Sequence, residues 1–135
     1  MAIPSLVNFL TLLNTEITNT SALTSIVSTR HYHSILPQNG SLPALTFKVI
    51  SINPTDTKDG ASDYDQVRVQ FSCYSSTGAG AETLYAALRT KFDRFTSSSG
   101  SVEFHFTRFI DRQPIDRDID TGSFVVTVDY SFTIK

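Results

Sequence analysis

Tryptophan is absent from this chain, and there is a single cysteine, Cys73, and a single methionine. One cysteine cannot close an internal disulfide, so the chain suits a reducing or redox-indifferent setting. Long hydrophobic runs are lacking as well. The apolar stretch Leu6–Leu13 is interrupted by Asn8 and Thr11, and it has neither the length of a membrane span nor the basic lead-in of a signal peptide. The sequence therefore predicts a soluble protein with no membrane partner.

Charge is scarce and nearly balanced. Charged residues make up 18% of the chain, and 11 basic residues face 13 acidic ones, for a formal charge of -2. Sequence-specific nucleic acid binding needs a concentrated Lys/Arg face, and no basic stripe is present. The shortage of Lys and Glu fits a surface used for protein contacts, since interface cores are depleted in these residues. A compositional habit of the source organism explains it equally well.

The length of 135 residues and the 40% hydrophobic content predict a single domain, residues 1–135, with one core. A first helix begins at Pro4 and fades near Thr20, because apolar residues recur there at helical spacing. A short second helical turn is expected over Ser21–Val27, and a longer helix over Ala81–Phe95. The apolar residues of the first helix are Leu6, Leu10, Leu13 and Ile17, and those of the longer one are Ala81, Leu84, Tyr85, Leu88, Phe92 and Phe95.

Alternating apolar and polar residues predict the strands. The clearest is Val67–Tyr74, in which Val67, Val69, Phe71 and Cys73 face the core. Two polar loops are expected, one over Asn53–Asp63 before this strand and one over Arg112–Gly122 between the last two strands. The second loop is too long for a tight turn, so we expect the last two strands to form a long C-terminal β-hairpin with a projecting tip. The predicted fold class is α+β, a largely antiparallel mixed sheet of about five strands packed by two helices. The expected strands are Arg30–Ser34, Ala44–Ile52, Val67–Tyr74, Val102–Asp111 and Ser123–Ile134, with a flexible connector over Thr96–Ser101.

Patterns that could hold a metal ion or a phosphate are all incomplete. His31 and His33 alternate along one strand, but a third ligand would have to be His105 or a scattered aspartate. The Gly78-Ala79-Gly80 turn lacks the third glycine and the Lys-Ser/Thr pair of a phosphate loop. The aspartates of the long loop lack the central glycine and terminal glutamate of an EF-hand; they are Asp116, Asp118 and Asp120. We therefore expect no metal and no cofactor.

Catalytic groups are no better supported. Cys73 could act as a nucleophile beside a histidine, but it falls on the apolar face of its strand, where a buried, inert thiol is expected. Asp63 with Asp65, or Glu103 with a later aspartate, could pair as acid and base, yet each is explained as a solvated charge. The sequence favours a protein that is not an enzyme.

Several short segments resemble one family when they are taken in order. The run Ser21–Tyr32 is followed by Leu36-Pro37-Gln38 and then by Leu42–Phe47, which begins Leu-Pro-Ala. Together with the Val67–Tyr74 strand, a helix and a closing hairpin, this order resembles the tail-terminator or tail-completion proteins of long-tailed phages. The resemblance covers nearly the whole chain, and it rests on order more than on any one motif.

This resemblance implies a structural virion protein at the neck, assembled in the host cytoplasm, that closes the head-proximal end of the tail tube as a homo-hexameric ring. It implies three partners: other copies of the chain, the major tail tube protein, and the head–tail connector or stopper protein. Phage DNA can pass through the lumen of such a ring. Two alternatives stay open: a head–tail connector or stopper, and a free-standing module that binds a peptide or small ligand on its sheet.

Ring closure needs two different complementary patches on each subunit. The candidates are the polar face of the Val67–Tyr74 strand and the loops Asn53–Asp63 and Arg112–Gly122, and we expect the second loop to reach a neighbouring subunit or the tube protein. A solvated hairpin tip is the alternative for this loop. The candidate interface residues are Arg68, Gln70, Tyr74, Asp56, Lys58, Asp59, Arg112, Asp116, Arg117 and Asp118.

Overall fold

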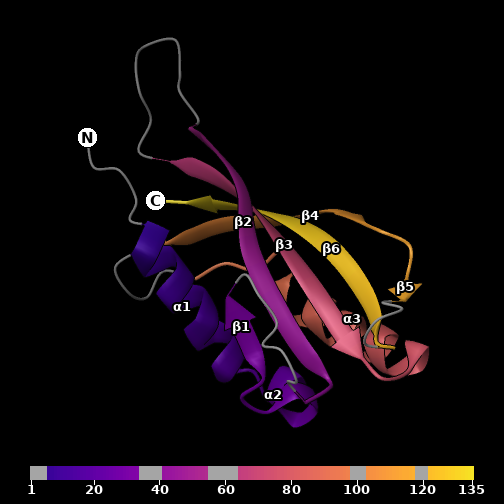
Figure 1. The fold of residues 1–135 in the computed structure, drawn as a ribbon. Coiled ribbons are helices and arrows are strands. Elements are labelled where there is room, and N and C mark those ends of the chain that lie inside the picture. The colour runs from indigo at the N-terminus through magenta and orange to yellow at the C-terminus, as the bar shows by residue number, and fades with distance from the viewer. Residues whose placement is uncertain (1–5, 34–40, 55–63, 98–102, 118–121) are drawn as a thin grey trace.

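A computed structural model describes residues 6–33, 41–54, 64–97, 103–117 and 122–135. Helices and one sheet build this part of the chain, as the α+β prediction requires (Figure 1). None of its helices is long and apolar enough to cross a bilayer. The elements are α1 (Leu6–Thr18), α2 (Ser21–Val27), β1 (His31–His33), β2 (Ala44–Pro54), β3 (Asp65–Ser75), α3 (Gly78–Phe92), β4 (Phe104–Arg112), β5 (Asp116–Arg117) and β6 (Phe124–Ile134).

The strands of the described residues form one mixed sheet in the order β1-β2-β3-β6-β4, and β5 also pairs with β6. Every pairing is antiparallel except β1 with β2. The closing hairpin is the predicted one, with β4 running beside β6. The strand that comes last in the chain, β6, lies between β3 and β4 in the interior of the sheet, while β4 is an edge.

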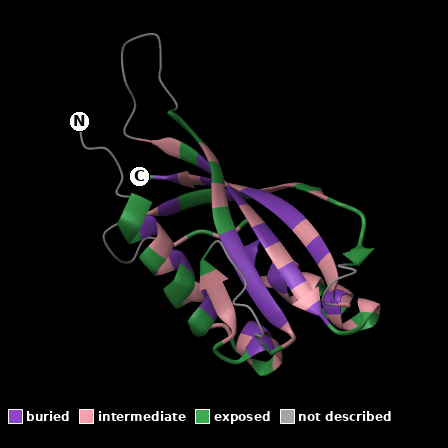
Figure 2. Ribbon diagram, viewed as in Figure 1, coloured by how far each residue is buried: buried purple, intermediate pink, exposed green. Residues whose placement is uncertain are grey.

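One face of the sheet carries the core. Along β3, alternate residues from Val67 to Ser75 are buried and the residues between them are partly exposed, as the period of two predicts (Figure 2). The ring of Phe9 in α1 lies 5.5 Å from those of Phe104 and Phe132, and Phe92 of α3 stacks 5.4 Å from a ring of β3. Helices α1 and α3 therefore cover the same face, and no described helix packs on the other.

The first helix differs from its prediction in which residues it buries. Leu6 was expected on the core face, but it is 37% exposed, whereas Phe9, Leu13 and Ile17 are fully buried. Leu10 packs at the margin of the core. The apolar residues lie at steps of four from Phe9, and the larger aromatic side chain reaches the rings of the sheet, so it takes the place expected for Leu6.

Helix α3 begins three residues earlier than predicted, at Gly78. The hydroxyl oxygen of Thr77 accepts a hydrogen bond from the Gly80 N–H at 3.0 Å and so caps the first turn. The helix ends at Phe92, since the next residue is extended and Arg94 has a left-handed φ of 59°. Its predicted stripe is buried apart from Tyr85 and Phe95, which pack at the edge of the core.

Two predicted loops are shorter in the structure. β2 continues to Pro54, past a bulge between Val49 and Ser51, so the first residues of the Asn53–Asp63 loop belong to a strand. Within Arg112–Gly122, β4 includes Arg112, and Asp116–Arg117 form β5 against β6. The hairpin end is therefore partly paired to the sheet where a wholly projecting loop was expected, because backbone groups beside β6 gain hydrogen-bond partners there. Of the predicted connector, Ser97 pairs with Phe104, and residues 98–101 lie outside the described residues.

Candidate functional site

The polar face of β3 is where the sequence placed three candidate contact residues. Arg68, Gln70 and Tyr74 all lie on the sheet face that carries no described helix, and each is partly exposed. Arg68 is tied to the neighbouring strand, since its Nη2 and Nε donate to Oδ2 of Asp129 at 2.6 and 3.2 Å. Gln70 and Tyr74 lie on the same face of β3. The one arginine of β3 is therefore already matched by a carboxylate, whereas the exposed Lys48 lies opposite Gln70 on β2.

Arg112 has a role inside the molecule that the sequence did not indicate. Its guanidinium donates to both carboxylate oxygens of Glu82 at 2.8 and 2.9 Å, and it lies 4.6 Å from the ring centre of Tyr85. The hydrogen bonds from Arg112 lower the pKa of Glu82. Arg112, a candidate interface residue, thus connects the end of β4 to α3, because its position on the strand directs it toward that helix.

The remaining candidates divide into exposed residues and residues outside the described ranges. Asp116 and Arg117 are exposed on β5, and Asp116 Oδ1 accepts a hydrogen bond from the backbone N–H of Arg117 at 2.8 Å. The guanidinium of Arg117 lies 5.7 Å from the ring centre of Phe124. These two side chains are accessible to a partner. Outside the described residues are Asp56, Lys58, Asp59 and Asp118, together with Asp63 and Asp120.

The histidines and the cysteine of the described residues make structural contacts. His31 contacts α1, with Nδ1 2.8 Å from Asn14 Oδ1, while His105 packs against Tyr64 at 4.9 Å between ring centres. No group of three potential metal ligands occurs among the described residues. Cys73 is fully buried, as predicted, and burial raises the pKa of its thiol to about 12, so the thiolate is scarce at neutral pH.

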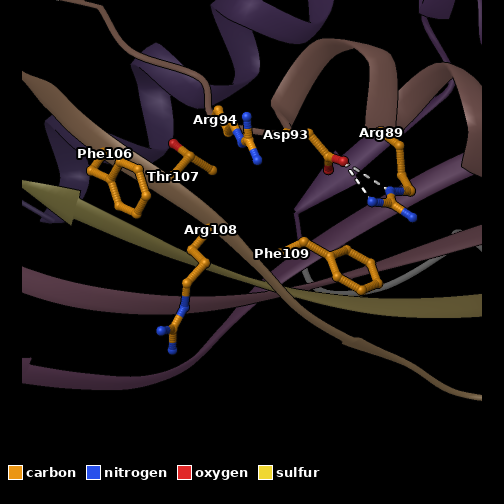
Figure 3. Close-up of a pocket in the computed structure, with 7 residues that line it drawn as sticks. All are labelled: Arg89, Asp93, Arg94, Phe106, Thr107, Arg108 and Phe109. Carbon is orange, nitrogen blue, oxygen red and sulfur yellow. Dashed lines mark hydrogen bonds and ion pairs between the residues drawn. The ribbon is translucent and has the colours of Figure 1, made fainter.

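A pocket of about 370 Å³ lies between the end of α3 and the edge strand β4, and sequence reasoning missed it (Figure 3). Its lining comes from two elements that follow one another in the chain, the end of α3 and β4, and their distance in space is not evident from local patterns. The spacing of four between Arg89 and Asp93 was a signal for their ion pair. The residues that line the pocket are Arg89, Asp93, Arg94, Phe106, Thr107, Arg108 and Phe109.

Asp93 organises one wall of this pocket. Its Oδ2 accepts hydrogen bonds from Nη2 and Nε of Arg89 at 2.7 and 3.0 Å, and its Oδ1 accepts one from the hydroxyl of the buried Tyr130. Burial alone would raise the pKa of Asp93, but the hydrogen bonds from Arg89 and Tyr130 outweigh it and lower the pKa. Arg89 also lies 4.3 Å from the ring centre of Phe109. These contacts join the wall of the pocket to the core.

The opposite side of the pocket is less completely paired. The backbone N–H of Arg94 donates to the carbonyl of Thr107 at 3.1 Å, which ties the helix end to β4. The hydroxyl of Thr107 is buried without a hydrogen-bond partner among the described residues. Phe106 is 48% exposed beside it. The pocket therefore combines an ion pair, a buried hydroxyl and an exposed aromatic ring.

Comparisons with known proteins identify the family to which the chain belongs. Residues 13–135 match the model of the family "Tail completion protein gp17", whereas no curated protein matches the chain. Among solved structures, a chain of the "Virion of native gene transfer agent (GTA) particle" is similar in fold, with a TM-score of 0.74, 12% identity, and coverage of 89% of each chain. The family match spans nearly the whole described fold, so this chain belongs to the tail completion protein gp17 family and is a structural protein of phage tails.

Proposed function

We propose that this chain closes the head-proximal end of the phage tail tube as a ring of six copies, which ends tail assembly and enables head–tail joining. The observation that carries the proposal is the family match over residues 13–135. The chain acts as a single domain in the virion neck, after assembly in the host cytoplasm, and it works without catalysis. Its partners are other copies of itself, the major tail tube protein and the head–tail connector protein, and phage DNA passes through the lumen.

The shape of the sheet supports a ring. A ring needs head-to-tail contacts in which two different patches of each subunit meet. Here the helices cover one face, so the opposite face and the two sides of the sheet are left for partners. We assign the polar face around Gln70 and Tyr74, and the exposed end of the hairpin at Asp116 and Arg117, to contacts with a neighbour or with the tube.

Assembly with purified tails tests this function. Tails from phage that lack this protein are incubated with the full-length chain and then with filled heads, and infectious particles are counted. We expect tubes without the chain to exceed their normal length and to join heads poorly, and added chain to restore joining. Electron microscopy of the restored tails should show one cap at the head-proximal end with sixfold symmetry.

Three results of this experiment would contradict the proposal: unchanged tube length without the chain, joining that does not depend on it, or a cap of another symmetry. Binding to isolated heads in the absence of tails would instead identify a connector on the head side. A variant with Gln70→Ala and Tyr74→Ala, which changes only partly exposed side chains, should fold normally but restore fewer particles. Its folding is checked by circular dichroism.

A further inference from the structure

The pocket between α3 and β4 carries an excess of positive charge. Three arginines and one aspartate line it, whereas the whole chain has a formal charge of -2. Arg89 and Asp93 form an ion pair with each other at 2.7 Å. Arg94 and Arg108 are exposed, and neither forms an ion pair within the part of the chain that the structure describes. Charge complementarity therefore favours an acidic occupant of this pocket.

The backbone at Arg94 has a conformation that disfavours any residue with a side chain. Arg94 is the first residue after the C-cap of α3, and its φ of 59° is left-handed. Glycine is the usual residue at this position of a helix end. A basic residue is favourable near a helix C-terminus, but Arg89 and Lys91 already supply that charge in the last turn of α3. The fold thus gains little from an arginine at position 94, whereas its guanidinium borders the pocket.

An exposed aromatic ring beside the arginines points to a polypeptide as the occupant. Phe106 is 48% exposed and lines the pocket together with Arg94 and Arg108. Figure 3 shows Arg94 on the helix side of β4 and Arg108 on the other side. Arginine and phenylalanine are enriched in protein interfaces, and guanidinium groups pair with carboxylates through two parallel hydrogen bonds. A free phosphate ion would pair with the arginines but would leave the ring of Phe106 in water.

The described carboxylates of this chain are poorly placed to be the counterpart in a ring. Those that are exposed and outside ion pairs belong to Asp111 and Asp116. They lie on β4 and β5, which pair with the same side of β6, so they share the edge of the sheet that carries the pocket. A head-to-tail contact joins different sides of two subunits. We therefore take the occupant to be another protein.

We propose that the pocket between α3 and β4 binds an acidic segment of a second protein in the neck, which pairs its carboxylates with Arg94 and Arg108 and covers Phe106. The inference rests on the proposed function, which places other proteins beside this chain. The segment binds through its side chains, because the backbone of β4 at Thr107 is already hydrogen-bonded to Arg94. The ion pair of Arg89 with Asp93 stays intact in the complex.

Titration with an acidic peptide tests the pocket on the full-length chain alone. Hexaglutamate is the probe and hexaglutamine the neutral control, both followed by calorimetry at an ionic strength of about 50 mM, where exposed charges are weakly screened. We expect saturable binding of hexaglutamate that becomes about tenfold weaker with Arg94→Gly or Arg108→Gln, because each variant removes one charge partner. Lys48→Gln, which removes an exposed lysine outside the pocket, is the matched control and should leave the affinity unchanged.

The Arg94→Gly variant also separates binding from folding. Glycine adopts the left-handed conformation without strain, so this variant should melt at or above the temperature of the unchanged chain while it binds hexaglutamate more weakly. If it melts lower, Arg108→Gln alone decides the question. Equal affinity for hexaglutamine, or equal losses of affinity in Arg108→Gln and Lys48→Gln, would overturn the inference. Inorganic phosphate that displaces hexaglutamate at equal concentration would identify a phosphate site and would overturn it as well.

Assembly distinguishes a second protein from a second copy. A chain with both Arg94→Gly and Arg108→Gln should restore head–tail joining poorly, although light scattering should show the same self-association as in the unchanged chain. Loss of self-association in this variant would identify a second copy as the occupant and overturn the inference. Normal joining by the variant would overturn it while leaving the proposed function intact. Failure of the unchanged chain to restore joining would count against the proposed function alone, since the peptide titration still decides what the pocket binds.

Discussion

Replacement of Phe92 by alanine should be among the most destabilising single changes in this protein. The side chain is fully buried at the end of α3. Loss of a core phenylalanine costs about 3–5 kcal/mol, because transfer free energy is lost and a cavity remains, and each aromatic pair adds about 0.5–1.5 kcal/mol. We therefore expect Phe92→Ala to lower the free energy of unfolding by about 4 kcal/mol. Its ring lies 5.4 Å from Phe71, 5.5 Å from Phe95, 5.8 Å from Phe132 and 6.4 Å from Tyr130.

Urea unfolding followed by far-ultraviolet circular dichroism measures this loss. With an m-value of about 1.5 kcal/mol/M, a loss of about 4 kcal/mol moves the midpoint down by about 2.7 M. Phe106→Ala is the matched control, since its ring is 48% exposed, and we expect it to cost under about 1 kcal/mol. If the alanine variant fails to fold, Phe92→Leu should still cost about 1–2 kcal/mol. Equal midpoints for the Phe92 and Phe106 variants would refute the assignment of this ring to the centre of the core.

Three further predictions use the same assay. The pKa of Asp93 is lowered in the folded state, so its contribution to stability is present above its unfolded pKa of about 4 and is lost as the pH falls through the folded value. Asp93→Asn should therefore lose less stability than the unchanged chain between pH 6 and pH 3. Parallel declines in the stability of the two proteins would contradict this. A double-mutant cycle of Arg112→Ala with Glu82→Ala should give a coupling of about 0.5–1 kcal/mol, because the pair is bidentate but partly exposed; additive losses would mean that the pair contributes nothing. Gly80→Ala should destabilise by about 1–3 kcal/mol, since its Cβ would lie 2.2 Å from a hydroxyl of β3, whereas Gly78→Ala, whose Cβ meets nothing nearer than 3.6 Å, should be neutral or stabilising.

The fold was predictable where its cause is local. The period of two along Val67–Tyr74 indicated a strand with one buried face, and the apolar spacing around Leu84 and Leu88 indicated the helix that covers it. The first helix shows the limit of this reasoning. Leu6 and Phe9 are both apolar near its start, and periodicity alone does not show which of them reaches the aromatic rings of β4 and β6.

The candidate site was less predictable because its contacts join distant parts of the chain. Arg68 binds Asp129, which is 61 positions away in the sequence, and Arg112 binds Glu82, which is 30 positions away. No local sequence pattern predicts either pair. The pocket between α3 and β4 likewise needs the turn at Arg94 to lie beside β4. The sequence shows which residues are charged, but the order of the strands in the sheet determines which of them form ion pairs.

The interior position of β6 has a consequence for synthesis of the protein. Because β6 lies between β3 and β4, β4 and one edge of β3 have no strand partner until β6 has left the ribosome, whereas the other edge of β3 can already pair with β2. Nascent chains therefore carry two unpaired strand edges and an uncovered aromatic cluster during translation, a state that invites aggregation or chaperone capture. The complete sheet can form only after translation of β6, and a stop codon before Phe124 would remove the strand that joins β3 to β4.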